Sequence, residues 1–289
     1  MKNFFGCMMI MILMVWAPVA VSAQESPNVF TYQLGSVEIC LLSEGQATGN
    51  SSIFVGASPE MIQKCLPEGT YPRSCNAFLI RTPDKNILVD TGYGRMLFEN
   101  LKLLGVTPEQ IDAILITHAH GDHLGGMILE GKAAFSNAEL YFSQPEYDYC
   151  MNGDDRNEGA RKMIEAYKSK LRLFQPNEID VQPDKLFPGI YAIAAYGHTA
   201  GHTLYMVESG SEKILIWGDL THAMAIQMPY PQVAMTYDTD TDKAIAARKK
   251  VLEYVAKNNI PVAGMHTAFP GIGRITKTSD GGFLHEPVK

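Results

Sequence analysis

The stretch that decides the fold is Thr117-His118-Ala119-His120-Gly121-Asp122-His123. It follows an apolar, β-branched run from Ala113 that predicts a buried strand. Imidazole and carboxylate are the ligands that zinc and its first-row neighbours accept, and this loop offers more of them than one catalytic metal usually takes. The alternative is a chance cluster of surface histidines, which the total of eight histidines in the chain disfavours. The stretch therefore predicts a site for two metal ions at the end of a strand.

Three further segments place metal-binding residue types directly after an apolar run. They are Gly197-His198-Thr199-Ala200-Gly201-His202, Trp217-Gly218-Asp219 with the nearby His222, and His266 after Pro261 to Met265. Because each candidate lies just beyond a predicted strand, we expect these side chains to converge on one rim of the fold.

Short runs rich in β-branched residues alternate with helical patterns along the chain, which indicates an α/β fold of one domain. The predicted strands are Phe30 to Leu42, Ala77 to Arg81, Asn86 to Asp90, Ala113 to Thr117, Glu139 to Ser143, Ile190 to Ala195, Thr203 to Glu208 and Lys213 to Trp217. Helices are predicted from Thr107, where Pro108 and Gln110 complete a capping-box pattern, from about Asp155 to Phe174, and from Asp240 to Lys257.

With these residues in view, the sequence resembles the metallo-β-lactamase superfamily, whose His-x-His-x-Asp-His signature is matched from His118 to His123. The resemblance implies an αβ/βα four-layer sandwich with two divalent metal ions, zinc by default and manganese, cobalt or iron as alternatives. It implies that the first metal is held by His118, His120 and His198, the second by Asp122, His123 and His266, and that the Asp219 carboxylate bridges both. Asp122 and Asp219 are then the expected catalytic residues, acting with a hydroxide shared by the metals.

The resemblance leaves three residues with open roles. The first histidine of Gly197 to His202 matches the ligand position, so His202 is expected to support the site instead of binding metal, and His222 receives the same interpretation. Asp90 resembles the family's early Asp-Thr-Gly turn, where it either orients a metal-binding imidazole or caps the turn.

Within the superfamily, the sequence is most similar to methyl parathion hydrolases and lactonases. The similarity lies in Ile214 to His222, Pro231 and Phe269 to Gly273. It implies hydrolysis of lactones, such as N-acyl homoserine lactones, or of aryl esters. An organophosphate triester is the alternative, weakened because Glu146 to Cys150 lacks the aromatic pocket of the organophosphate hydrolases.

Other members of the superfamily fit less well. Asp219 disfavours a β-lactamase, and the 23 residues after His266 leave no room for the helical domain of glyoxalase II. An iron-dependent oxidoreductase of the same fold and a non-catalytic binding protein are the rivals from other classes.

The N-terminus predicts export. Residues 1–23 combine Lys2, an apolar run from Met8 to Val19 and the small residues Val21-Ser22-Ala23, which together indicate a cleavable signal peptide, with residues 24–289 forming the hydrolase domain. The apolar run is shorter than the roughly 20 residues that a membrane span needs. The expected location is therefore the periplasm or the medium, without stable membrane association, and a homodimer is left open.

Charge and cysteine content bear on partners and disulfides. The net charge of −7 disfavours nucleic acid as a partner and leaves a small-molecule ester or lactone as the expected one.

After signal removal, Cys40, Cys65, Cys75 and Cys150 remain. A disulfide between Cys65 and Cys75, across a loop rich in proline and glycine, and four free thiols are equally favoured.

Overall fold

The computed structural model describes residues 26–153, 157–181 and 185–288. The predicted signal peptide lies outside the described residues. Among the helices that are described, none has the length and apolar character needed to cross a membrane.

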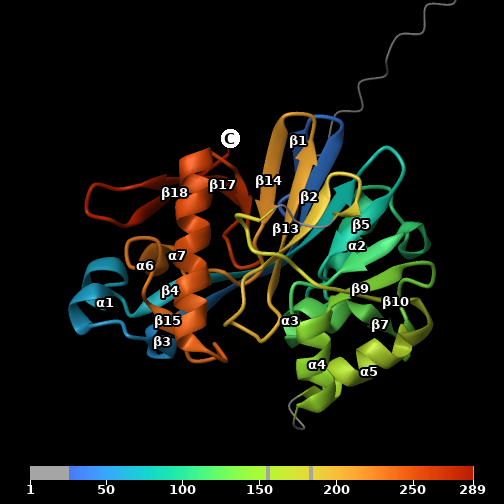
Figure 1. The fold of residues 1–289 in the computed structure, drawn as a ribbon, viewed down its shortest axis with the longest axis horizontal. Coiled ribbons are helices and arrows are strands. Elements are labelled where there is room, and N and C mark those ends of the chain that lie inside the picture. The colour runs from blue at the N-terminus through green and yellow to red at the C-terminus, as the bar shows by residue number, and fades with distance from the viewer. Residues whose placement is uncertain (1–25, 154–156, 182–184, 289) are drawn as a thin grey trace, which may run out of the picture.

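Two seven-stranded sheets form the centre of the fold (Figure 1). The first sheet consists, in spatial order, of β1 (Val29–Leu34), β2 (Val37–Asn50), β4 (Thr70–Arg81), β5 (Asn86–Val89), β6 (Ala113–Leu115), β9 (Glu139–Ser143) and β10 (Leu171–Phe174). The second consists of β11 (Lys185–Phe187), β12 (Ile190–Ala194), β13 (Thr203–Ser209), β14 (Glu212–Ile216), β16 (Val262–Ala263), β17 (Ile272–Lys277) and β18 (Phe283–Pro287). Pairing is parallel from β5 through β6 and β9 to β10, and between β14 and β16.

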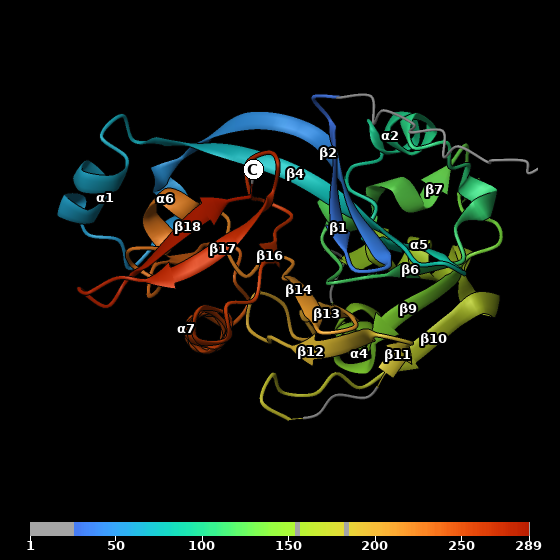
Figure 2. The ribbon, with the colours of Figure 1, turned by 90° about the horizontal axis from the view of Figure 1, so that it is seen from above.

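Helices cover the outer faces of both sheets (Figure 2). The helices are α1 (Pro59–Cys65), α2 (Leu97–Leu103), α3 (Gly121–Leu124), α4 (Gln144–Asn152), α5 (Glu158–Ala166), α6 (Met224–Gln227) and α7 (Thr241–Asn258). One apolar core fills the space between the sheets, a second lies between the first sheet and α2, α4 and α5, and a third lies between the second sheet and α7. This arrangement confirms the predicted α/β four-layer sandwich.

The longest helix, α7, agrees closely with its prediction. The Asp240 side chain accepts a hydrogen bond from the Lys243 amide and so caps the N-terminus, while Asn259 ends the helix with a φ of 51°. Its apolar face packs on the second sheet through Val251, Leu252 and Val255. Arg248 of this helix is also buried.

Three element predictions were wrong in part. Residues 30–42 form two antiparallel strands, because Gly35 with a φ of 57° turns the chain between β1 and β2. The capping box at Thr107 is present, but it opens only the 3-10 turn Pro108–Gln110, since the chain must enter β6 three residues later. The predicted helix of residues 155–174, whose first residues lie outside those described, ends at Ala166, and residues 171–174 pair with β9 as strand β10.

The four cysteines are free thiols, so the disulfide predicted between Cys65 and Cys75 is not formed. Cys65 ends α1, whereas Cys75 lies buried in β4, where its Sγ is 3.5 Å from the Asp122 carbonyl oxygen. Burial raises the pKa of the Cys75 thiol to about 12. Cys65 thus packs against an apolar cluster, whereas Cys75 lies beside the loop of Asp122, and neither forms a cross-link.

Candidate metal centre

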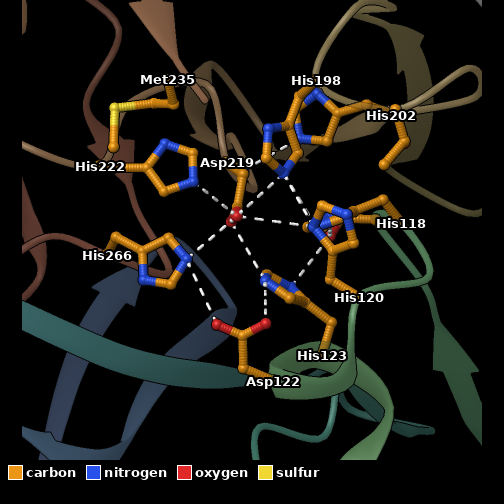
Figure 3. Close-up of polar contacts among 12 residues, drawn as sticks. His118, His120, Asp122, His123, His198, His202, Asp219, His222, Met235 and His266 are labelled. Carbon is orange, nitrogen blue, oxygen red and sulfur yellow. Dashed lines mark hydrogen bonds and ion pairs between the residues drawn. The ribbon is translucent and has the colours of Figure 1, made fainter. Parts of the chain in front are cut away.

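The predicted site residues all lie just after strands of the two facing sheets, either in connecting loops or, for Asp122 and His123, in the short helix α3. His118, His120, Asp122 and His123 follow β6, and His198 follows β12. Asp219 follows β14, and His266 follows β16. A hydrogen bond of 2.9 Å from the Thr203 amide to the Thr117 carbonyl joins the loops from the two sheets. Figure 3 shows these side chains pointing toward one another around Asp219, so the structure brings together all seven residues.

Three imidazole nitrogens meet at one point. His118 Nε2 is 2.9 Å from His120 Nδ1, and His198 Nε2 is 3.2 Å and 3.1 Å from these two atoms. Three ligands of a tetrahedral zinc ion, each about 2.0–2.1 Å from it, would be roughly 3.3 Å apart. The spacing and chemistry of these nitrogens, with the Asp219 carboxylate completing the set, therefore fit a metal ion.

A second group forms beside the first. Asp122, His123 and His266 bring their ligand atoms within 4.8 Å of one another. The buried atoms His123 Nε2 and Asp219 Oδ1 lie 3.2 Å apart, and neither has a hydrogen-bond partner among the described residues. Such orphaned atoms cost free energy unless something satisfies them, and a second cation would satisfy both.

The Asp219 carboxylate lies between the two groups. Its Oδ2 is 3.3 Å from His198 Nε2 and 3.0 Å from His266 Nε2, so one carboxylate touches residues of each group (Figure 3). Burial raises the pKa of Asp219, but the surrounding histidines, His123 first, oppose it and hold the pKa well below its usual value. This carboxylate is ionised at neutral pH and is positioned to bridge two cations.

The other ring nitrogen of most of these histidines is already engaged. His198 Nδ1 contacts Asp238 Oδ1 at 2.8 Å, and His266 Nδ1 contacts the Ser74 carbonyl at 2.7 Å. His123 Nδ1 contacts Asp90 Oδ2 at 2.7 Å. These contacts fix the ring orientations and direct the free nitrogens inward.

The contact with His123 favours the first of the two roles predicted for Asp90, which is to orient a metal-binding imidazole. Its buried carboxylate also accepts hydrogen bonds from the amide and hydroxyl of Thr117, at 2.8 and 2.7 Å. Its φ of 59° is unusual for a residue other than glycine, which indicates that the loop holds it in place.

The two uncertain histidines have different surroundings. Both nitrogens of His202 are used in scaffolding, since Nδ1 contacts the Ala195 carbonyl and Nε2 accepts a hydrogen bond from the Asp219 amide at 2.9 Å. His222 instead directs Nε2 at Asp219 Oδ2, 3.0 Å away, and stacks on the His266 ring. His222 thus faces the site and could contribute to the second group, whereas His202 holds Asp219 in place.

Glu146 is a supporting residue that the sequence reasoning missed. It is 1% exposed, and its carboxylate accepts hydrogen bonds from the Ala119 amide at 2.8 Å, the Thr199 hydroxyl at 2.7 Å and the Gly201 amide at 2.8 Å. It therefore joins the loop of His118 and His120 to the loop of His198. The signal was present as Ser143-Gln144-Pro145-Glu146, a helix-start pattern that predicts α4.

A buried arginine forms a second missed support. Arg248 on α7 donates to the carbonyls of Leu220, Pro231 and Val233 at 2.7–3.0 Å. Its guanidinium is also 3.9 Å from Asp238, the partner of His198. The charge of Arg248 thus compensates a carboxylate that orients a residue of the metal centre.

An open cavity of about 310 Å³ gives access to the centre. Its floor is formed by His120, Asp122, Asp219, His222 and His266. A small molecule in this cavity would contact the metal-binding atoms directly.

The family model described as "Metallo-beta-lactamase superfamily" matches residues 70–262. The chain belongs to the metallo-beta-lactamase superfamily. It is thereby a metal-dependent hydrolase of that superfamily, and its cluster of histidines and aspartates corresponds to the dinuclear metal site of the fold.

Several members of the superfamily are similar over most of the chain. A hydrolase named AbOPH has a TM-score of 0.80 and 28% identity, covering 92% of this chain and 99% of its own. AidC, described as a dizinc quorum-quenching lactonase, has a TM-score of 0.82 and 26% identity, covering 91% and 98%. An N-acyl homoserine lactonase of Bacillus cereus is 24% identical over 62% of this chain and 76% of its own.

Proposed function

We propose that this hydrolase cleaves lactones or other carboxylic esters at a dinuclear metal centre. The observation that carries the proposal is the Asp219 carboxylate, which touches both groups of ligands at the floor of an open cavity. Similarity to one lactonase over 91% of the chain and to another over 62% of it supports an ester bond as the target.

The residues of each group have distinct proposed roles. His118, His120 and His198 would hold one cation, and Asp122, His123 and His266 the other, with Asp219 between them. Two such cations supply a hydroxide at neutral pH and polarise the bond to be cleaved. Asp219 would lie between them, and its carboxylate, whose pKa the surrounding histidines hold well below its usual value, would stay ionised and offer negative charge to both. Asp122 also faces the cavity, where it is next to any bound ester.

Two substitutions test the assignment of the metal ligands. Asp122→Ala and Asp219→Ala should each lower the metal content from two ions toward one and abolish ester hydrolysis, while circular dichroism shows the fold retained. Asp242→Ala, which removes an exposed carboxylate of α7, is the matched control and should keep both metals and full activity. Full hydrolysis by a metal-depleted sample would overturn the proposed mechanism.

A substrate panel and elemental analysis separate the alternatives. Homoserine lactones, aryl esters, an organophosphate triester and a β-lactam should be tested with metal-loaded protein, and the proposal expects the first two to be cleaved fastest. Two zinc ions per chain agree with the proposal, whereas one iron would favour an oxidoreductase. Metal binding without any turnover would favour a binding protein.

We infer from the leader-like residues 1–23 that the protein acts in the periplasm or the medium. N-terminal sequencing of the exported protein should find a start near Gln24. Retention of the full chain in the cytoplasm would contradict this.

A further inference from the structure

The walls of the cavity above the metal centre are polar and aromatic. Apart from the residues of the floor, the cavity is lined by Tyr71, Tyr93, Tyr237, Gly121 and Arg73. In the part of the chain that the structure describes, no aliphatic side chain lines it. Its volume of about 310 Å³ is at the small end of the range for small-molecule sites. A compact substrate fits these walls better than one with a long alkyl chain.

Arg73 is the one wall residue with a full charge. It lies on β4 opposite Ala47 of β2. Burial raises the pKa of the Tyr71 and Tyr93 hydroxyls, and the Arg73 guanidinium opposes that rise, so its charge acts on the cavity. Among the described residues, no carboxylate forms an ion pair with Arg73, in contrast to Arg81 and Arg172.

A second hollow of about 200 Å³ adjoins the first and shares its Arg73 and Tyr93 walls. Arg95 also lines this hollow, and its guanidinium lies over the Tyr93 ring, 4.7 Å from the centre. Besides Asp122, which also belongs to the floor of the first cavity, the acidic residue that lines this hollow is Glu44. The Glu44 carboxylate already accepts hydrogen bonds from the amides of Arg95 and Met96, at 2.7 and 3.0 Å. The hollow therefore presents two guanidinium groups to solvent next to the metal centre.

We propose that the preferred substrate is a compact ester or lactone that carries a carboxylate, and that Arg73 binds this carboxylate. The proposal rests on the proposed ester hydrolysis and narrows its substrate class. A guanidinium matches a carboxylate in a two-pronged geometry, and here the carboxylate would lie where the two hollows meet, beside Arg73 and within reach of Arg95. The scissile ester would then face Asp219 and the other metal-binding residues.

Matched substrates test this specificity in the metal-loaded enzyme. The 4-nitrophenyl monoester of glutaric acid carries the carboxylate, 4-nitrophenyl pentanoate lacks it, and N-decanoyl homoserine lactone supplies a long neutral chain. A charge-assisted hydrogen bond predicts that kcat/KM for the glutarate monoester exceeds that for the pentanoate by about tenfold, and that added salt reduces this ratio. Equal or faster turnover of the pentanoate or of the decanoyl lactone would overturn the proposal.

Substitutions assign the effect to Arg73. Arg73→Met should remove the preference for the glutarate monoester by raising its KM, with the kinetics of the pentanoate unchanged, and Arg73→Lys should retain part of the preference. Lys249→Met changes the net charge equally at an exposed position of α7 and should leave the preference intact. An equal loss for both substrates in Arg73→Met would show that Arg73 has only a structural role.

A binding measurement decides the proposal even if no ester is cleaved. Calorimetry should show that the metal-loaded protein binds glutaramate, an amide that carries the carboxylate, about tenfold more tightly than pentanamide, which lacks it, and that Arg73→Met abolishes the difference. Absence of ester turnover with this difference intact would refute the proposed function but not the carboxylate site. Equal binding of the two ligands would refute the carboxylate site.

Discussion

Replacing Glu146 with glutamine should loosen the metal centre without removing any metal-binding residue. Oε1 of Glu146 accepts one hydrogen bond, from the Ala119 amide, and Oε2 accepts two, from Thr199 and Gly201. A glutamine side chain has one oxygen and one NH₂ group, which cannot accept. Its oxygen is expected to keep the two bonds from Thr199 and Gly201, so the NH₂ group would face the amide of Ala119.

The size of the effect follows from the lost hydrogen bond. A buried hydrogen bond to a charged group contributes about 1.5–3 kcal/mol to stability. In Glu146→Gln the Ala119 amide would face an NH₂ group and would gain no hydrogen bond to offset this loss. At about 2–4 °C per kcal/mol, thermal unfolding should shift down by roughly 3–12 °C. Because Ala119 lies between His118 and His120, metal affinity should fall by about 10- to 100-fold, as is typical when a residue that orients ligands is changed.

Thermal unfolding by circular dichroism and competition with a chromophoric chelator would measure both effects. Glu165→Gln is the matched control, since the Glu165 carboxylate forms an exposed ion pair with Lys168 and its loss should cost no more than about 1 kcal/mol. If Glu146→Gln bound two metals with unchanged affinity and melted with the control, the assigned role of Glu146 in holding the two loops would be wrong.

Three further measurements test the supports of the fold and the site. Arg248→Met should lower the free energy of unfolding by about 3–5 kcal/mol in urea titrations, because it leaves the buried Asp238 carboxylate without its cation, and Arg248→Lys should lower it less. Burial lowers the pKa of His285 to about 4, so the folded state keeps it neutral while the unfolded state takes up a proton below about pH 6.5. The contribution of neutral His285 to the free energy of unfolding is therefore present above pH 6.5 and is lost as the pH falls toward 4. In chelator-treated protein, His285→Phe should reduce this loss of stability in acid by at most about 3 kcal/mol. An unchanged dependence of the free energy of unfolding on pH would contradict the assignment. Chelation of the wild-type protein should lower its melting temperature, and zinc at a thousandfold excess over its Kd should restore about 4 kcal/mol.

The sequence was sufficient for the residues at the centre of the site. Ligand chemistry is carried by few residue types, and here they recur directly after strands, so local pattern selected the loop of His118 and the later segments that contain His198, Asp219 and His266. The resemblance to the superfamily then separated the expected ligands from the neighbouring His202 and His222. Helix α7 was equally accessible, because its cap at Asp240 and its apolar period are local features. The convergence of these residues on one rim also follows from a general rule, because loops that follow the strands carry functional residues on a shared scaffold.

The supporting residues were not accessible in the same way. Glu146 is separated from Thr199 by 53 positions and His198 from Asp238 by 40, and nothing in the sequence near either acid specifies the partner. Residues 171–174 continue a helical pattern in the sequence, but they pair with β9 at the edge of the sheet. Their secondary structure is therefore set by a segment about 30 residues earlier in the chain. Tertiary pairing overrides local propensity at such places.

The substrate specificity of the site is expected to depend on the residues of the cavity wall more than on the metal-binding residues. The metal-binding residues lie just after strands in the interior, where both sheets constrain them, and the fold is shared with solved structures that are only 26–28% identical. Arg73 lies on the part of β4 that extends beyond the core, and its side chain is exposed. A change there costs little stability, so the substrate can change while the centre does not. Under the proposed specificity, charge on this wall, and not the histidine cluster, would distinguish a hydrolase of anionic esters from one of neutral lactones.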